Sequence, residues 1–162
     1  MNKEWSLDVL YKGFQDESFN SDLKSLEGLI HSFKDYVKDL NTSNSNKEIC
    51  NLIDYMEKIH LISNKLSDYI SLCQSTDTKN SETIFFMQKL EELMSNISKE
   101  EAIAKKYIAN TDKLDEIIKN DFKLREYEFF LSKIKIEAEH TLDDKVEEVV
   151  AKMNLSAGSA WS

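Results

Sequence analysis

The stretch that decides the fold is LKSLEGLIHSFKDYVKDL (residues 23–40). Its apolar residues recur at alternating intervals of three and four, a spacing that places them on one face of an α-helix. They are Leu23, Leu26, Ile30, Phe33, Val37 and Leu40. Ser18 or Asn20 is the expected N-cap ahead of this face. The stretch therefore predicts an amphipathic helix with one buried side.

Two later stretches repeat the pattern. The first spans residues 49–73, with Ser63 as its one polar position. The second spans residues 86–107, where Glu100 takes one of the apolar positions. A capping-box match that begins at Ser98 allows a break in this stretch. The continuing periodicity favours one uninterrupted helix.

The rest of the chain reads as connections and shorter helices. Polar, turn-forming segments at 41–46 and 74–81 separate the three long stretches. Shorter helical patterns follow at 112–119, 122–138 and 141–153. No segment alternates with period two over a useful length, so no sheet is expected. The predicted fold is all-α, with long antiparallel helices forming a bundle that the shorter helices close.

The last helical pattern, residues 141–153, begins with a second capping-box match. Thr141 stands three residues before Asp144, as a side chain that caps the first turn would. The apolar positions then recur at helical spacing and are Leu142, Val146, Val149, Val150 and Met153. This segment is expected to form an amphipathic helix.

Composition narrows the class of protein. The chain has 162 residues, 41% of them apolar and 31% charged, which suits one compact domain with a real core. Three glycines and no proline favour long helices. The net charge is -9 and no basic stripe stands out, which disfavours nucleic acid as a partner. No apolar run approaches the roughly 20 residues of a membrane span, and the N-terminus lacks an apolar signal core. These features predict a cytoplasmic protein.

The two cysteines, Cys50 and Cys73, fall within one predicted helix. A separation of 23 residues along a helix is about 34 Å, too far for a disulfide. They are interpreted as small apolar residues in a reducing compartment.

The three histidines decide most enzyme hypotheses. None of His31, His60 and His140 stands in a HExxH zinc motif, and the chain has no Gly-rich phosphate loop. His31 and His60 are expected on helix surfaces, and His140 at the junction of two helices. Four aromatic residues of the second half are interpreted as core or core-edge positions, namely Tyr107, Tyr127, Phe129 and Phe130.

One sequence pattern, Glu-x-x-His, suggests a metal site as an alternative hypothesis. Glu57 and His60 form a Glu-x-x-His pair, and so do Glu137 and His140. Two such pairs on separate helices, with further glutamates, build a di-iron site inside a bundle. Glu57 and His60 flank the apolar seam instead of occupying it, however, and the second pair is expected to straddle a helix break. The di-iron bundle is therefore the weakest of the hypotheses.

Both ends of the chain resemble a known family. WSLDVLY (5–11), an acidic loop and SDLKSLEGLI (21–30) resemble the N-terminus of the oligoendopeptidase F family. The segment EAEHTLDDKVEEVVAKMNLSAGSAWS (137–162) is the more specific match, because its His-Thr-Leu, helix, small-residue and Ala-Trp order is similar to that family's. The matching positions are His140, Thr141, Leu142, Glu148, Ala151, Gly158, Ala160 and Trp161.

The resemblance implies a role without chemistry of its own. Members of that family, related to thimet oligopeptidase, are cytoplasmic zinc metallopeptidases that cut short peptides. Their HExxH helix lies beyond the matching region, so no catalytic or metal-binding residue carries over, and zinc is expected only in the parent enzyme. Residues 1–155 would be the N-terminal helical domain that forms a wall of the peptide channel. Residues 156–162 would begin the linker into a missing catalytic domain.

Further expectations follow from this interpretation. The chain alone should be inactive, and its partners should be its own catalytic domain and short peptides. The surface that would meet the catalytic domain, with Trp161 near it, could drive self-association. The competing hypothesis is a stand-alone helical-bundle interaction module.

Overall fold

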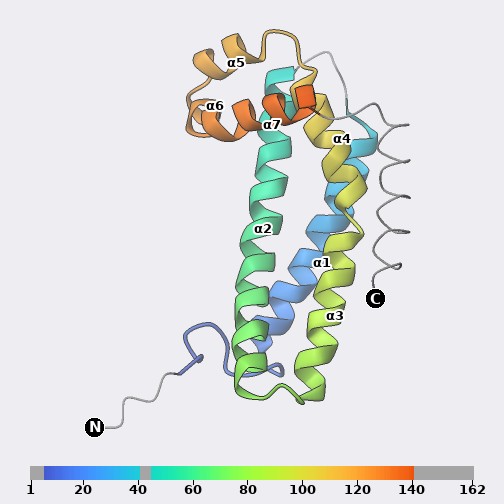
Figure 1. Ribbon diagram of the computed structural model, residues 1–162, viewed down its shortest axis with the longest axis vertical. Helices are drawn as coiled ribbons and strands as arrows, with labels where there is room; N and C mark the ends of the chain where they lie inside the picture. Colours follow the sequence, from blue (N-terminus) through green and yellow to red (C-terminus); the bar gives the residue numbers. More distant parts are fainter. Residues whose placement is uncertain (1–5, 41–44, 141–162) are drawn as a thin grey trace, which may run out of the picture. The chain divides into compact units, whose positions relative to one another are not determined.

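The computed structural model describes residues 6–40 and 45–140, and every regular element in these ranges is an α-helix. The all-α prediction is therefore confirmed. The helices, labelled in Figure 1, are α1 (Glu17–Lys38), α2 (Ser45–Thr76), α3 (Ser81–Ser95), α4 (Ser98–Ala109), α5 (Leu114–Asn120), α6 (Phe122–Glu126) and α7 (Glu128–His140).

The chain divides into two compact units. Unit 1 is Met1–Ala104 and unit 2 is Lys105–Ser162, so the division falls inside α4. Unit 1 contains the three longest helices, and unit 2 contains the short ones.

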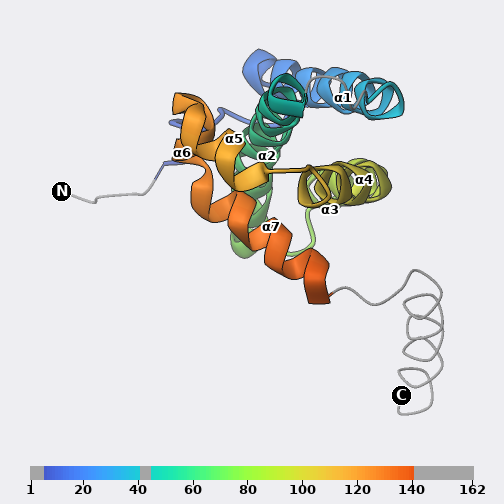
Figure 2. The same ribbon diagram turned by 90° about the horizontal axis from the view of Figure 1, so that it is seen from above.

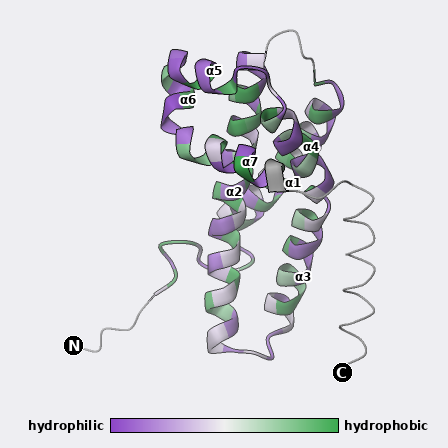
Figure 3. Ribbon diagram, turned by 45° about the horizontal axis from the view of Figure 1, so that its top comes forward, coloured by the Kyte–Doolittle hydropathy of each residue, from purple (hydrophilic) through white to green (hydrophobic). Residues whose placement is uncertain are grey.

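Unit 1 is built on α1, α2 and α3, which run up, down and up (Figure 1). The same three helices are seen from above in Figure 2. Helix α2 packs against both α1 and α3. Hydrophobic and hydrophilic residues alternate along each helix (Figure 3), as expected when one face of each is buried. The antiparallel arrangement predicted for the long helices is thus present.

The predicted apolar stripes form the core of unit 1. On α1 the buried residues are Phe19, Leu23, Leu26, Ile30, Phe33 and Val37. On α2 they are Ile49, Leu52, Ile53, Met56, Ile59, Ser63, Leu66, Tyr69 and Ile70. Ser63 is buried among them because its hydroxyl donates a hydrogen bond to the His60 carbonyl at 3.2 Å, which satisfies the polar group.

An aromatic cluster joins the irregular segment before α1 (residues 6–16, called the lead-in segment) to the helices. Tyr11 and Phe14, which precede α1, have ring centroids 5.2 and 5.3 Å from that of Phe19. The Phe19 ring lies 5.0 Å from Phe86 of α3. Burial raises the pKa of Tyr69, on α2 in the same cluster, to about 12, so the phenol stays neutral. The cluster holds the irregular segment and three helices together.

A polar clasp fixes the same lead-in segment. The Tyr11 hydroxyl donates to Asp22 Oδ2 at 2.6 Å, and Lys65 Nζ donates to the same oxygen at 2.7 Å. The Lys65 ammonium also lies 4.5 Å from the Tyr11 ring centroid. Partial burial alone would raise the pKa of Asp22, but the bonds from Lys65 and Tyr11 outweigh it and lower that pKa. Burial and the bond to Asp22 raise the pKa of Tyr11.

Two helix boundaries differ from the prediction. Helix α1 begins earlier than expected, because Asp16 is its N-cap and accepts from the Ser18 N–H at 2.9 Å. Neither Ser18 nor Asn20 is the cap. The third long stretch is not continuous, since α3 ends before Asn96 and α4 starts at Ser98. The prediction of one uninterrupted helix was wrong.

Unit 2 consists of short helices with their own buried residues. Ile108, Leu114, Ile118, Leu124, Leu131 and Ile134 are each at most 3% exposed. The stretch 122–138, predicted as one helix, consists of two helices, because the helical backbone is interrupted at Tyr127 between α6 and α7. Asp121 caps α6 by accepting from the N–H groups of Lys123 and Leu124. An ion pair of 2.9 Å joins Lys135 of α7 to Asp115 of α5.

The aromatic residues of unit 2 are less buried than predicted. Tyr107 and Tyr127 are half-buried, as core-edge positions would be. Phe129, in contrast, is 85% exposed and Phe130 is 37% exposed. The assignment of Phe129 to the core or its edge was wrong, because Leu131 and Ile134 take the inward-facing positions of α7.

Cys50 and Cys73 both lie on α2, are half-buried and form no disulfide, as their spacing predicted.

Candidate functional site

The family-motif residues lie at the edge of what the structure describes. His140 is the last residue of α7, and its side chain is outside the description. The other predicted site residues lie outside the described residues, namely Thr141, Leu142, Glu148, Gly158, Ala160 and Trp161.

The other two histidines lie on helix surfaces, as expected. His31 is exposed on α1, with its Nε2 atom 3.3 Å from Asp35 Oδ2. His60 is exposed on α2, and Glu57 beside it is exposed as well. The seam residues Met56 and Ile59 are buried, so the Glu57–His60 pair flanks the core instead of entering it.

The second Glu-x-x-His pair differs from the expectation. Glu137 and His140 both belong to α7, so they do not straddle a helix break. The helix simply continues to the end of the described range. Within residues 6–40 and 45–140, no group of three or more His, Cys, Asp or Glu side chains could hold a metal ion. The described residues therefore do not fit a zinc or di-iron centre.

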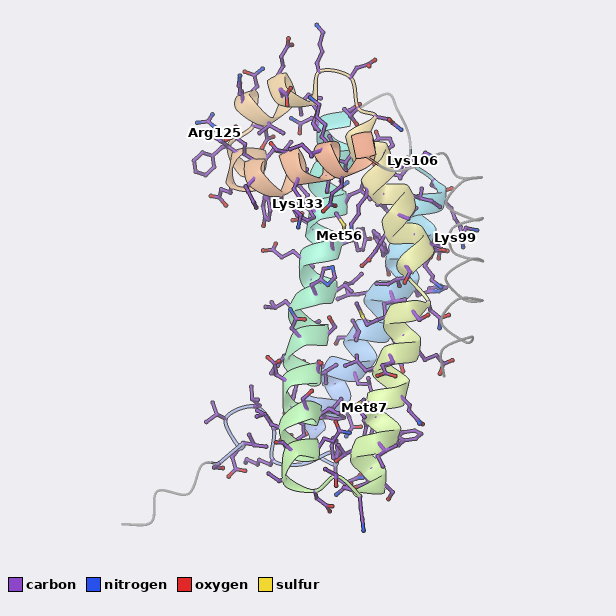
Figure 4. All side chains as sticks on the ribbon, in the orientation of Figure 1. Met56, Met87, Lys99, Lys106, Arg125 and Lys133 are labelled. Carbon is purple, nitrogen blue, oxygen red and sulfur yellow. The ribbon has the colours of Figure 1, made fainter. Side chains whose placement is uncertain are left out.

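A groove between α2 and α3 is the clearest surface feature of unit 1. It has a volume of about 360 Å³ and is open to solvent. Its lining is His60, Ser63, Asn64, Ser67, Ile70 and Ser71 from α2, with Met87, Leu90, Glu91 and Met94 from α3. Met87 is labelled on α3 in Figure 4. The α2 side is mainly polar and the α3 side mainly apolar.

The polar side of this groove follows a regular spacing. His60, Asn64, Ser67 and Ser71 are separated by four, three and four residues, which places them in one line along α2. Each stands one position after a residue of the buried α2 stripe. Sequence reasoning did not single out these residues, although the same interval rule that finds the core also finds this line.

The groove has the features of a binding surface. Among the described residues, the side chains of Asn64, Ser67 and Ser71 make no hydrogen bond with another group. Serine and asparagine offer both donors and acceptors, as the N–H and C=O groups of a peptide backbone require. An activated nucleophile would need a base within hydrogen-bond reach, and in the part of the chain that the structure describes neither serine has one.

His60 forms one end of the groove and faces a buried carboxylate. Its Nε2 atom lies 3.6 Å from Oε1 of Glu101, on the first turn of α4. That oxygen is shielded from solvent and has no hydrogen-bond partner among the described residues. The contact becomes an ion pair when His60 is protonated.

A second groove, between α1 and α2, has a volume of about 420 Å³. Several of its polar groups are already paired. The Tyr36 hydroxyl donates to Glu48, and Asn51 Nδ2 donates to the Tyr36 oxygen at 3.0 Å. The ring of Tyr55 packs on that of Tyr36 at 5.3 Å. This groove offers a ligand fewer free donors and acceptors than the groove between α2 and α3.

Comparison with known proteins found a family model that is similar to the C-terminal third of the chain. Residues 109–162 match the family model described as Oligopeptidase F. A search of curated proteins and a search of solved structures found no match to the chain. The matched range includes α5, α6 and α7 and every family-motif residue from His140 to Trp161. The match covers about a third of the chain, so it is a similarity of this part of the chain to the Oligopeptidase F family model.

No helix in the described ranges is both long enough and apolar enough to cross a bilayer.

Proposed function

We propose that this chain is the N-terminal helical domain of a cytoplasmic, zinc-dependent oligoendopeptidase, and that it serves as one wall of the channel in which short peptides are bound. The match of residues 109–162 to the Oligopeptidase F model carries this proposal. The His-Thr-Leu and Ala-Trp motifs at residues 140–142 and 160–161 fall inside that match.

Unit 1 suits the role of a channel wall. Three antiparallel helices joined by short connections form a stiff support. The groove between α2 and α3 adds a line of free hydroxyl and amide groups opposite the apolar side chains of Met87, Leu90 and Met94. Polar groups on the wall would bond the backbone of an extended peptide, and the apolar side would contact its side chains.

The hydrolytic step belongs to another part of the parent enzyme. The described residues do not fit a zinc site, and none of the three histidines is part of a HExxH motif. In such enzymes zinc supplies the activated water that attacks the peptide bond. The contribution of this chain is to bind the peptide and to exclude folded proteins from the channel.

A peptidase assay tests this assignment. Purified chain 1–162 should leave a short quenched-fluorescent peptide intact. The product of the complete reading frame that contains these residues should cleave it and should lose that activity to a chelator. Chelator-sensitive cleavage by chain 1–162 alone would contradict the proposal, as would a complete product with no peptidase activity.

The groove can be tested in the same complete product. Ser67→Ala and Ser71→Ala together should raise KM for the peptide, with little change in kcat, because they remove binding groups and leave the chemistry intact. Ser21→Ala and Ser25→Ala, on the exposed side of α1 and four residues apart like Ser67 and Ser71, are the matched control and should change neither constant. Equal KM values for the groove and control variants would show that peptide does not contact this groove.

A further inference from the structure

The groove between α2 and α3 carries one carboxylate to which the channel-wall role gives no task. Glu91 of α3 lines the groove next to Leu90 and is exposed. Among the described residues, the Glu91 carboxylate has no hydrogen bond and no ion pair. It is therefore available to a ligand that enters the groove.

The lining of this groove holds no permanent cation that would balance the charge of Glu91. In the part of the chain that the structure describes, the lining contains neither lysine nor arginine. The Lys65 ammonium of α2 pairs instead with Asp22 of α1 at 2.7 Å. The Lys89 ammonium of α3 pairs with Glu27, also on α1, at 2.8 Å. The groove thus presents a negative charge, which a positively charged ligand group complements.

The length of the groove suits a short extended peptide. Its polar line on α2 runs from His60 to Ser71, which are 11 residues apart, or about 16 Å along the helix. An extended chain advances about 3.3 Å per residue, so a segment of about five residues fits this length. Alternate side chains of such a segment point to the same side and are about 6.6 Å apart.

The α3 side of the groove offers an apolar, an acidic and again an apolar position. Met87, Glu91 and Met94 follow one another at steps of four and three residues, which are about 6 Å and about 4.5 Å along the helix (Met87 is labelled in Figure 4). The first step is close to the spacing of alternate side chains in an extended peptide. The flexible side chain of Met94 can adapt to the second.

We propose that this groove selects extended peptide segments in which a lysine or arginine stands between two apolar residues, each two positions away. The basic side chain pairs with the Glu91 carboxylate, and the two apolar side chains contact Met87 and Met94. Asn64 and Ser67, across the groove, bond the peptide backbone. Glu91 is then the specificity-determining residue of the groove. This selection rests on the proposed role of the chain as a peptide-binding wall.

Peptide binding to chain 1–162 tests the selection without any hydrolytic step. The probe is a dye-labelled peptide Leu-Ala-Lys-Ala-Leu, capped at both ends, and fluorescence anisotropy measures its dissociation constant. In a second peptide norleucine replaces the lysine, which keeps the aliphatic stem and removes the charge. An exposed ion pair changes affinity by up to about fivefold, so the lysine peptide should bind about three- to fivefold more tightly.

Substitution of Glu91 should remove this preference. Glu91→Gln should make the two peptides bind equally, because it removes the charge and keeps the shape of the side chain. Glu91→Lys should reverse the preference, so that a peptide with glutamate at the middle position binds more tightly than the lysine peptide. Both substitutions should leave the circular dichroism signal unchanged, because Glu91 is exposed.

Glu92→Gln is the matched control for the charge of the whole chain. The net charge of -9 attracts any cationic peptide, and both glutamine variants reduce it equally. Glu92 is the next residue of α3, is exposed and does not line the groove. The Glu92→Gln variant should therefore keep the three- to fivefold preference for the lysine peptide.

Three results would overturn the selection. The unmodified chain could bind neither peptide, it could bind both equally, or the two glutamine variants could lose the preference to the same extent. Failure of the peptidase role gives a different result, namely a complete product that cleaves no peptide. In that case binding to chain 1–162 still decides whether Glu91 selects a basic residue.

Discussion

At the scale of single residues, Thr83 shows a local conflict between burial and polarity. It is fully buried near the start of α3, where its N–H donates to the Asn80 side chain at 3.0 Å. Its hydroxyl oxygen has no hydrogen-bond partner among the described residues. A buried hydroxyl left unpaired costs about 1–3 kcal/mol, because it has lost its bonds to water.

Thr83→Val should therefore stabilise the protein by about 1 kcal/mol. The substitution keeps the branched shape and removes only the unpaired hydroxyl. Urea denaturation followed by circular dichroism measures the change in the free energy of unfolding. Thr111→Val is the control, because the Thr111 hydroxyl donates to the Tyr107 carbonyl at 2.9 Å, and its loss should destabilise. A destabilised Thr83→Val variant would mean that the hydroxyl does have a partner.

Asp22 predicts a pH dependence of stability. The bonds from Lys65 and Tyr11 hold its pKa below the ordinary value of 3.8. The unfolded chain then binds this proton more readily than the folded chain. Stability from Asp22 is therefore present above the ordinary pKa and is lost as the pH falls through the lowered folded pKa. Asp22→Asn should cost more free energy of unfolding at pH 7 than at pH 2.5.

Lys65→Met supplies the control for this prediction. It removes one of the two donors to Asp22, so the effect of Asp22→Asn at pH 7 should shrink in the Lys65→Met background. Denaturant curves of the four proteins at the two pH values give the comparison. An Asp22→Asn effect that is the same at both pH values would contradict the clasp.

At the scale of elements, α1 carries a glycine that its geometry does not require. Gly28 lies inside the helix, and a Cβ added there would meet no atom within 4 Å. Gly28→Ala should stabilise the protein by about 1 kcal/mol, because glycine loses more backbone entropy than alanine in a helix. Thermal or urea denaturation measures the gain.

Gly13→Ala is the informative contrast. Gly13 has a φ of +152°, a conformation that other residues rarely adopt, so the same substitution should destabilise. Gains at both positions, or at neither, would contradict this account of the lead-in and of α1.

The junction of α3 and α4 explains why one boundary was missed. Leu90, Ile97 and Ala104 are spaced by seven residues and are all buried, although the helix is interrupted between α3 and α4. The break keeps Ile97 in phase with the core, so apolar periodicity does not reveal it. The competing capping-box signal at Ser98 marked the correct place.

Ile97 should therefore be critical to the junction. It is fully buried, and Ile97→Ala should cost about 2–5 kcal/mol in free energy of unfolding. Ile103→Ala, at a 43% exposed position of α4, should cost less than about 1 kcal/mol. Similar costs in urea denaturation would show that Ile97 does not anchor the break.

At the scale of the whole molecule, the sequence predicted which side chains are buried in the core better than which ones are exposed on the surface. The stripes of α1 and α2 were confirmed because core burial imposes the three-and-four spacing. Phe129 was wrongly assigned to the core or its edge, because the sequence does not tell which apolar residues of a helix are buried when they occur on both of its sides. The line from His60 to Ser71 was missed because polar residues on a helix usually face only water. The groove that this line forms with α3 depends on the packing of two helices, which the sequence pattern does not contain.

Self-association is a further whole-molecule prediction. The surface around Trp161 would meet the catalytic domain, and in its absence the chain should form dimers as the concentration rises. Light scattering over a wide concentration range measures this, and Trp161→Ala should weaken it. A strict monomer at the highest concentration would contradict the prediction.

The central claim is that these 162 residues form the front part of a zinc peptidase. Determining the coding sequence beyond codon 162 tests it most directly. The account predicts that the same reading frame continues and encodes a HExxH motif further along. A stop codon directly after codon 162, or a complete frame without HExxH, would contradict the claim and favour a stand-alone helical interaction module.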